Sequence, residues 1–302
     1  MPSDPTTSRL SVRDWLSVAA VALMWGSSFL FIKFGVQDFP PGTVAWLRIS
    51  LGAAALACLP IARTPLRHPG DRRLIAVLGI VWMAIPFTLF AYAEVHISSA
   101  LAGMINGATP LFTALLAALW LRDRTSRRMA VGLVVGFLGV VVTGWPNVEG
   151  RASAAAVVMV LAATLCYGVA FNISGVLQRR NGALPVIWRA QIVAMIVTTP
   201  LGVTGLVEAT PSLAGVTAIL VLGVLGSGAA FVMFTDLAGR VGATRGSITT
   251  YLAPVIALAL GAGLAGEAIA RLSLLGIVLV LVGAWFTSAG RGPTPSDGAG
   301  RR

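Results

Sequence analysis

Long runs of apolar residues, separated by short polar or basic segments, follow one another along almost the whole chain. A helix needs about 20 largely apolar residues to cross a membrane. The runs are continuously apolar instead of alternating, which favours membrane helices over the strands of a barrel. The pattern predicts ten spanning helices, at residues 15–34, 44–62, 74–93, 98–120, 129–145, 154–177, 186–206, 213–235, 246–265 and 272–289.

The composition excludes a soluble protein. Hydrophobic residues make up 57% and charged residues 11% of the 302 positions, whereas a soluble domain carries roughly 25% charged residues. One soluble core could not bury so much apolar surface, so lipid is the expected solvent for most of the chain. A soluble enzyme, a disordered protein and a nucleic-acid binder are therefore ruled out.

Basic residues gather on one side of the predicted topology. With the N-terminus in the cytoplasm, the inner segments hold 17 of the 22 Lys and Arg residues, and the outer loops hold only Arg151 and Arg271. The other three, Lys33, Arg48 and Arg189, lie within or at the ends of spans. This bias follows the positive-inside rule. It predicts a multi-pass membrane protein of ten spans with both termini cytoplasmic, and it accounts for the net charge of +11 without nucleic acid.

The two halves of the chain resemble each other. A shift of 144 residues places Pro110 on Pro254, and a shift of 142 places Trp25 on Tyr167. Because each half has five predicted helices, equivalent helices must cross the membrane in opposite directions, as in the inverted repeats of many secondary transporters. The predicted fold is therefore an all-α membrane protein of two inverted five-helix repeats. Its parts are a cytoplasmic segment 1–14, a first repeat 15–145, a second repeat 154–289 and a disordered cytoplasmic tail 290–302.

Several short motifs of the chain occur together in one known family. They include Arg48 at the head of the second span, and an acidic position that recurs as Asp123 and Glu267 in the two repeats. The others are Trp25-Gly26-Ser27-Ser28-Phe29, Ser98-Ser99-Ala100-Leu101-Ala102, Thr109-Pro110-Leu111-Phe112-Thr113 and Arg122-Asp123-Arg124. Over nearly the whole chain this pattern resembles the EamA family of the drug/metabolite transporter superfamily. In the second repeat, residues 245–247 are a looser match.

The resemblance implies a ten-helix basket around a central substrate cavity. Spans 1, 3, 4, 6, 8 and 9 would line the cavity, and spans 5 and 10 would lie at the periphery. Members of the family include exporters of amino acids and related metabolites, and importers of vitamins or nucleotide-like metabolites. The motifs are poor guides to the substrate.

The remaining motifs indicate no catalytic, metal or cofactor site. Residues 261–266 match the dinucleotide-binding glycine pattern, but they end a membrane helix, where glycines serve close helix packing. A phosphate-binding loop needs a lysine after its glycine, and the chain has a single lysine, Lys33. Glu94 and Asp236 stand at helix ends, where a solvated interfacial charge is expected. Because proton coupling usually uses a membrane-embedded Asp, Glu or His, a uniporter or exchanger fits as well as a proton antiporter.

The candidate substrate-binding residues are polar or aromatic groups at mid-depth. Trp and Tyr normally gather at the membrane interfaces, but Trp25, Trp82 and Tyr167 lie near the centres of their spans. Packing or lipid-facing roles are the alternative for these three. Asn106 must bond a neighbouring helix or face the cavity, because an unpaired buried amide costs ~1–3 kcal/mol. Tyr251, one turn before a proline of the ninth span, is a further candidate.

Arg48 and three prolines complete the set of candidates. Arg48 is expected to snorkel to the interface by default, and the alternative is a clamp for an anion or carboxylate. Pro86, Pro110 and Pro254 can each kink a span and free a carbonyl. They are candidate hinges, with a static kink as the alternative.

These observations predict a secondary transporter, a multi-pass protein of a bacterial inner membrane, that moves a small metabolite by alternating access. A cavity with aromatic groups and without deep charges suits amino acids, particularly hydrophobic or aromatic ones, and related compounds. Export is expected from the resemblance alone. The alternatives are an importer of a vitamin- or nucleotide-like metabolite, and a non-transporting scaffold or sensor. The expected partners are a small-molecule substrate and the lipid bilayer, with no nucleic acid and no cofactor, and a homodimer stays open.

Overall fold

The computed structural model describes residues 11–121, 127–147, 150–241 and 248–289. Within these ranges every regular element is helical, so the prediction of an all-α protein is confirmed. Asp123, the motif at 245–247, the predicted tail 290–302 and the first ten residues of the segment 1–14 lie outside the described residues.

The first half of the chain folds into helices joined by short turns. Its α-helices are α1 (Val12–Asp38), α2 (Pro41–Ala57), α3 (Arg72–Gly79), α4 (Ile85–Ala93), α5 (Ser99–Asn106), α6 (Thr109–Leu121) and α7 (Arg127–Gly144). A π-helical segment, η3 (Ile80–Ala84), joins α3 to α4 without a break. Single 3-10 turns lie at η1 (Pro60–Arg63), η2 (Pro69–Asp71) and η4 (Trp145–Asn147).

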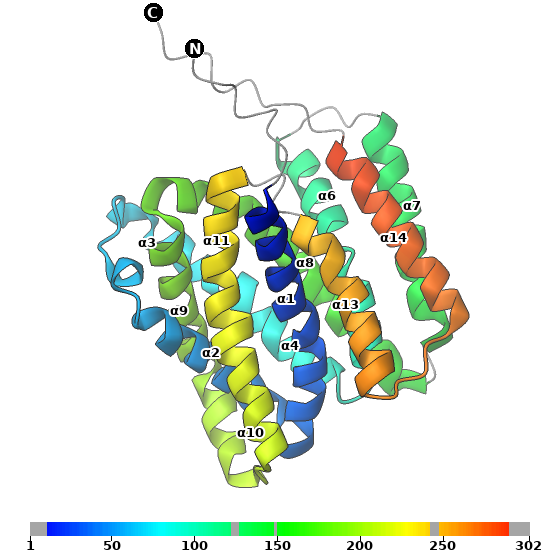
Figure 1. Cartoon of the computed structure of the whole chain (residues 1–302), viewed down its shortest axis with the longest axis horizontal. Coiled ribbons are helices and arrows are strands. Elements are labelled where there is room, and N and C mark those ends of the chain that lie inside the picture. The colour runs from blue at the N-terminus through cyan, green and yellow to red at the C-terminus, as the bar shows by residue number, and fades with distance from the viewer. Residues whose placement is uncertain (1–10, 122–126, 148–149, 242–247, 290–302) are drawn as a thin grey trace, which may run out of the picture.

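The second half repeats this design. Its α-helices are α8 (Gly150–Asn181), α9 (Ala183–Thr204), α10 (Leu213–Leu220), α11 (Ala230–Val241), α13 (Ile248–Leu264) and α14 (Arg271–Ala289). A second π-helical segment, η6 (Val221–Ala229), joins α10 to α11, and a 3-10 turn, η5 (Gly205–Glu208), follows α9. Most helices run side by side along one direction (Figure 1). We call the end of the bundle at which α1 begins the proximal end, and the end at which Asp38 lies the distal end.

Lipid is a suitable solvent for the outer faces of this bundle. Six helical segments of the described chain are long and apolar enough to cross a membrane: Val12–Asp38, Pro69–Ala93, Ser99–Trp120, Ser153–Asn181, Ala183–Glu208 and Leu213–Leu237. Shorter apolar helices lie at Ala130–Thr143, Thr249–Leu264 and Arg271–Phe286. Many large apolar side chains are exposed on these helices, as expected where the surface meets hydrocarbon. The count of ten spans stays a prediction.

Helices α7 and α14 form a closely packed pair at one edge of the bundle (Figure 1). Glycines bring the two backbones together: a Cβ atom on Gly283 would lie 2.5 Å from Cα of Gly136, and one on Gly139 would lie 2.6 Å from the backbone nitrogen of Val280. Without a hydrophobic driving force in lipid, such close approach of small residues is what holds helices together. The pair corresponds to the fifth and tenth predicted spans, which the resemblance placed at the periphery.

Two of the predicted spans are interrupted in ways that the apolar pattern does not reveal. The fourth is divided between α5 and α6, with Gly107 and Ala108 between them. The third predicted span contains η3, so just before α4 the backbone hydrogen bonds have the wider spacing of a π-helix. Pro86 and Pro110 stand in the first turns of α4 and α6, where proline is well tolerated. Pro254 lies inside α13. The hinge role of these three prolines stays a prediction.

Candidate functional site

A cavity in the interior of the bundle brings together side chains from both halves of the chain. Five of the six predicted substrate-binding residues line it: Trp25, Arg48, Trp82, Asn106 and Tyr167. They come from α1, α2, η3, α5 and α8. Phe231 of α11 and Thr250 of α13 line the cavity as well, so all six spans that the resemblance implied contribute, and α2 adds Arg48.

Tyr251 is not among the residues that line this cavity, and its part in substrate binding stays a prediction. Its hydroxyl donates a hydrogen bond to the backbone carbonyl of Ala284 on α14, at 3.1 Å. Its neighbour Thr250 lines the cavity instead. Successive residues of a helix point about 100° apart, so a shift of one position turns the side chain away from the cavity.

Aromatic side chains surround the cavity in a continuous series that we call the aromatic collar. Its members are Trp25, Phe231, Trp82, Phe171, Tyr167, Phe90 and Phe29. Successive ring centroids are 5.2–6.4 Å apart, within the range of favourable aromatic pairs. The series starts and ends on α1, where Trp25 and Phe29 are one helical turn apart. It offers ring faces and edges to an apolar or aromatic group inside the cavity.

Arg48 is buried beside the collar. Only 6% of the residue is exposed. Its Nε donates to Oγ of Ser227 at 2.9 Å, and its guanidinium carbon lies 3.8 Å from the ring centroid of Phe87. The expectation that Arg48 snorkels to the interface is therefore wrong, because a hydrogen bond and a cation–π contact hold it inside the bundle. Neither of the ion pairs within the described part of the chain involves it.

Small residues create the space in which Arg48 is held. A Cβ on Gly52 would lie 2.8 Å from Cβ of Ser227, so α2 and η6 can approach closely only with glycine there. Gln191 of α9 donates from Nε2 to the backbone carbonyl of Ser227 at 2.6 Å. Ser227 is thus fixed from two sides, and it orients the guanidinium in turn.

Polar groups also line the cavity. Ser28, Asn106, Thr109 and Thr250 all line it. The hydroxyl of Thr109 donates to the backbone carbonyl of Asn106 at 2.7 Å and lies 3.2 Å from its side-chain oxygen. This contact spans the break between α5 and α6, so the break sets the orientation of the Asn106 amide.

Both π-helical segments carry cavity residues. Trp82 lies in η3, and Gly226 lies in η6. The repeat shift of 142 residues places η3 on residues 222–226, within η6. Single π-helical turns inside α-helices often mark functional sites. The two halves of the chain therefore use the same backbone irregularity at equivalent places.

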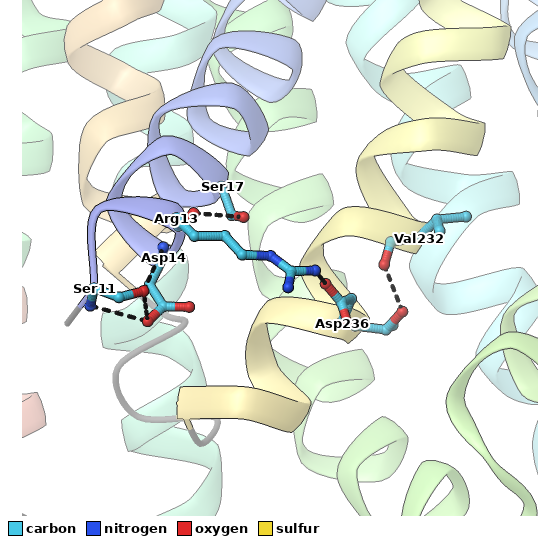
Figure 2. Close-up of polar contacts among 7 residues, drawn as sticks. Ser11, Arg13, Asp14, Ser17, Val232 and Asp236 are labelled. Atoms are coloured by element: carbon cyan, nitrogen blue, oxygen red, sulfur yellow. Dashed lines mark hydrogen bonds and ion pairs between the residues drawn. The ribbon is translucent and has the colours of Figure 1, made fainter. Parts of the chain in front are cut away.

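The two acidic residues at helix ends differ sharply. Asp236 pairs with Arg13 at 3.9 Å, and the two side chains are 57% and 76% exposed (Figure 2). This is the solvated interfacial charge that was expected. Glu94 is 0% exposed, so the same expectation is wrong for it. The turn after α4 is drawn inward, because Lys33 of α1 donates to the backbone carbonyls of Glu94 and Ile97.

The described fold, with its apolar outer faces and a cavity lined by both halves of the chain, is that of a multi-pass membrane protein. A family model described as the EamA-like transporter family matches residues 15–145 and again residues 154–289. The chain belongs to this family of membrane transporters. The predicted location, as a multi-pass protein of a bacterial inner membrane, is confirmed by the family, by the six apolar helical segments and by relatives named as inner membrane transporters.

Curated relatives extend over almost the whole chain. A protein of Streptantibioticus cattleyicolor, named a probable terminal-alkyne amino-acid exporter, is 30% identical over 91% of this chain and 93% of its own length. An uncharacterized transporter of Archaeoglobus fulgidus is 24% identical over 91% and 98%. The uncharacterized inner membrane transporter YedA of Escherichia coli K12 is 26% identical over 90% and 89%. A crystal structure with a TM-score of 0.64 and 18% identity, covering 91% of this chain and 97% of the other, has the same fold.

Proposed function

We propose that this transporter exports a small amphipathic metabolite, an amino acid with an apolar or aromatic side chain or a related carboxylate, by alternating access. The observation that carries the proposal is the buried guanidinium of Arg48 on the wall of a cavity ringed by the aromatic collar. A planar guanidinium matches a carboxylate in charge and hydrogen-bond geometry. Aromatic faces suit an apolar side chain.

The remaining polar groups fit the other end of such a substrate. Asn106, Thr109 and Thr250 offer amide and hydroxyl groups that can accept hydrogen bonds from an ammonium group. An amino acid would therefore contact a cation at its carboxylate, oxygen atoms at its ammonium group, and rings around its side chain.

We further propose ten membrane spans with both termini in the cytoplasm. The excess of basic residues in the predicted inner segments supports this orientation. Export is the proposed direction, and it is supported by the name of the Streptantibioticus cattleyicolor relative. With this orientation the distal end of the bundle faces the outside of the cell.

Two sets of polar contacts between the halves of the chain support alternating access. At the distal end, the Asp38 carboxylate accepts hydrogen bonds from the backbone nitrogen of Ser212, at 2.9 Å, and from its hydroxyl. We call this contact the distal latch. At the proximal end, Asn181 donates to the Asp71 carboxylate at 2.8 Å, and Arg180 pairs with the same carboxylate at 3.4 Å. We call these contacts the proximal latch.

The latches are related by the repeat. A shift of 142 residues places Asp38 on Arg180, and a shift of 141 places Asp71 on Ser212. In each latch, the end of the first helix of one half therefore holds the start of the third helical segment of the other half. A contact of this kind at each end of the cavity is what a transporter needs if it opens the two ends in turn.

Counterflow in liposomes tests the substrate proposal. Vesicles containing the purified protein and unlabelled L-phenylalanine are expected to take up labelled L-phenylalanine from outside. An excess of L-leucine should compete, and phenethylamine, which lacks the carboxylate, should not. Arg48→Gln is expected to reduce the exchange about tenfold or more, because a hydrogen bond to a charged group contributes about 1.5–3 kcal/mol.

Arg128→Gln is the matched control. Arg128 is exposed on α7, and its guanidinium carbon lies 5.0 Å from the ring centroid of Trp285, away from the residues that line the cavity. Its exchange should equal that of the wild type. Equal exchange by Arg48→Gln, or equal competition by phenethylamine, would remove the carboxylate clamp. If no labelled amino acid exchanges, a vitamin- or nucleotide-like substrate, or a scaffold or sensor role, takes the place of the proposal.

A further inference from the structure

Glu94 is a buried carboxyl group without a hydrogen-bond donor. It follows the last residue of α4 and of the apolar segment Pro69–Ala93. The residue is 0% exposed, and neither carboxylate oxygen has a hydrogen-bond partner among the described residues. Burial of an unpaired carboxylate is strongly unfavourable, and such a group usually takes up a proton instead.

The ammonium group of Lys33 is bonded to the backbone of the turn that carries Glu94. Nζ of Lys33 donates to the backbone carbonyl of Glu94 at 2.8 Å and to that of Ile97 at 3.1 Å. Lys33 therefore holds the turn that carries Glu94 without forming an ion pair with its carboxylate. A small movement of α1 relative to α4 would change how this ammonium group faces the carboxyl.

Charged groups from three other parts of the fold act on Glu94. Lys33 from α1 and Arg48 from α2 favour its ionised form, and Glu267, from the segment before α14, favours its neutral form. Burial has the largest effect and raises the pKa of the Glu94 carboxyl well above its ordinary value. On α8, which packs on α4, Tyr167 stacks on Phe90 of α4, and His96, two residues beyond Glu94, is exposed.

Glu267 ties this region to the other half of the chain. Its carboxylate accepts hydrogen bonds from the backbone nitrogen and the hydroxyl of Ser99, at 2.8 and 3.0 Å, and from the backbone nitrogen of Ala100, at 2.9 Å. It thereby caps the start of α5, five residues after Glu94. The contacts that close the distal end hold the two halves of the chain together. The burial of Glu94 depends on this same packing of the halves.

We infer that Glu94 is a proton-binding site, and that its protonation is coupled to closure of the distal end of the cavity. This inference rests on the proposed alternating access. With the distal end closed, Glu94 is dry and unpaired, and it holds a proton taken from water. The proton is taken from the water on the distal side as that end closes. When the proximal end opens, movement of α1 turns the Lys33 ammonium group toward the carboxyl group, which favours the carboxylate, and the proton leaves to the proximal side. If the distal end faces the outside of the cell, one proton enters for each substrate that leaves.

Infrared spectroscopy tests the proton site without any substrate. At neutral pH the wild-type protein in lipid vesicles should show the C=O band of a protonated, dry carboxylic acid. The band should shift on labelling glutamate with ¹³C, disappear in Glu94→Gln and persist in Asp236→Asn, which removes the exposed carboxyl at the proximal end. A wild type without this band, or an unchanged band in Glu94→Gln, would overturn the inference.

A flux measurement tests the coupling. Vesicles are loaded with labelled L-phenylalanine, the membrane potential is clamped with valinomycin and potassium, and a pH difference of one unit is applied. One proton per substrate would drive an about tenfold concentration ratio in the wild type. Glu94→Gln should not build up this concentration ratio but should still carry out counterflow exchange. Glu94→Asp should still show the driven ratio and the exchange.

The infrared and flux measurements distinguish failure of this inference from failure of the proposed function. Counterflow in Glu94→Gln shows that the variant is folded, so a driven ratio equal to that of the wild type would refute the coupling. If the wild type exchanges no phenylalanine, the proposed substrate fails, and the infrared band alone then decides whether Glu94 binds a proton.

Discussion

At the scale of single residues, Tyr251 and Asn106 are two predicted binding residues with different surroundings. The Tyr251 hydroxyl bonds the carbonyl of Ala284 and so joins α13 to α14, away from the residues that line the cavity. Asn106 lines the cavity next to the break between α5 and α6. The two side chains are therefore expected to respond differently to truncation.

Tyr251→Phe should leave counterflow unchanged and lower the free energy of unfolding by about 0.5–1.5 kcal/mol, because one neutral hydrogen bond is lost. Asn106→Ala should reduce counterflow with little loss of protein from the membrane. Exchange assays and thermal unfolding in detergent measure the two effects. Loss of exchange in Tyr251→Phe at normal stability would place Tyr251 in the binding site.

Sequence reasoning could identify those cavity residues that are unusual for their depth. Trp25, Trp82 and Tyr167 stand out because aromatic residues with a polar atom normally lie at the interfaces. The phenylalanines of the aromatic collar could not be singled out, because a phenylalanine in a membrane span is equally suited to lipid. The burial of Glu94 was missed because it depends on Lys33, 61 residues away.

At the scale of helices, the α7–α14 pair depends on glycine contacts remote from the cavity. A Cβ on Gly283 would lie 2.5 Å from backbone atoms of Gly136, closer than real contacts allow. Gly283→Ala is therefore expected to separate the helices and lower the free energy of unfolding by about 1–3 kcal/mol. Counterflow should persist in the folded fraction, because neither helix lines the cavity.

Gly263→Ala is the matched control for this packing contact. A Cβ at Gly263 would meet nothing within 4 Å, and alanine favours the helical state over glycine. Its stability should equal or slightly exceed that of the wild type in the same thermal unfolding assay. If both variants unfold at the same temperature, close approach of α7 and α14 does not contribute to stability.

The apolar pattern located the helices better than it located their ends and irregularities. Helix α1 continues beyond the predicted run 15–34 to Asp38, and α8 continues beyond 154–177 to Asn181, because a helix can extend past the hydrocarbon into polar surroundings. The apolar pattern did not indicate the break before α6 or the two π-helical segments. In lipid, apolar residues suit every face of a helix, so hydropathy does not report which backbone hydrogen bonds are shifted.

At the scale of the whole molecule, the repeat could be inferred from the shifts of 142 and 144 residues, but the latches could not. Their partners are not alike in sequence. At the distal latch the carboxylate belongs to the helix end, Asp38, whereas at the proximal latch it belongs to the helix start, Asp71. Equivalent positions thus carry different residue types and still form equivalent contacts, which only the folded arrangement reveals.

The latches predict opposite effects on access to the cavity. A single reporter cysteine at Thr250, in a background of Cys58→Ser and Cys166→Ala, is labelled with a membrane-impermeant maleimide from either side of oriented vesicles. Asp38→Ala removes the hydrogen bonds of the distal latch, so it should raise labelling from the distal side. Asp71→Ala should do the same from the proximal side. Asp236→Ala, which removes an exposed carboxylate that belongs to neither latch, should change neither. If both latch variants raise labelling from the same side, or neither does, the two latches do not govern alternating access.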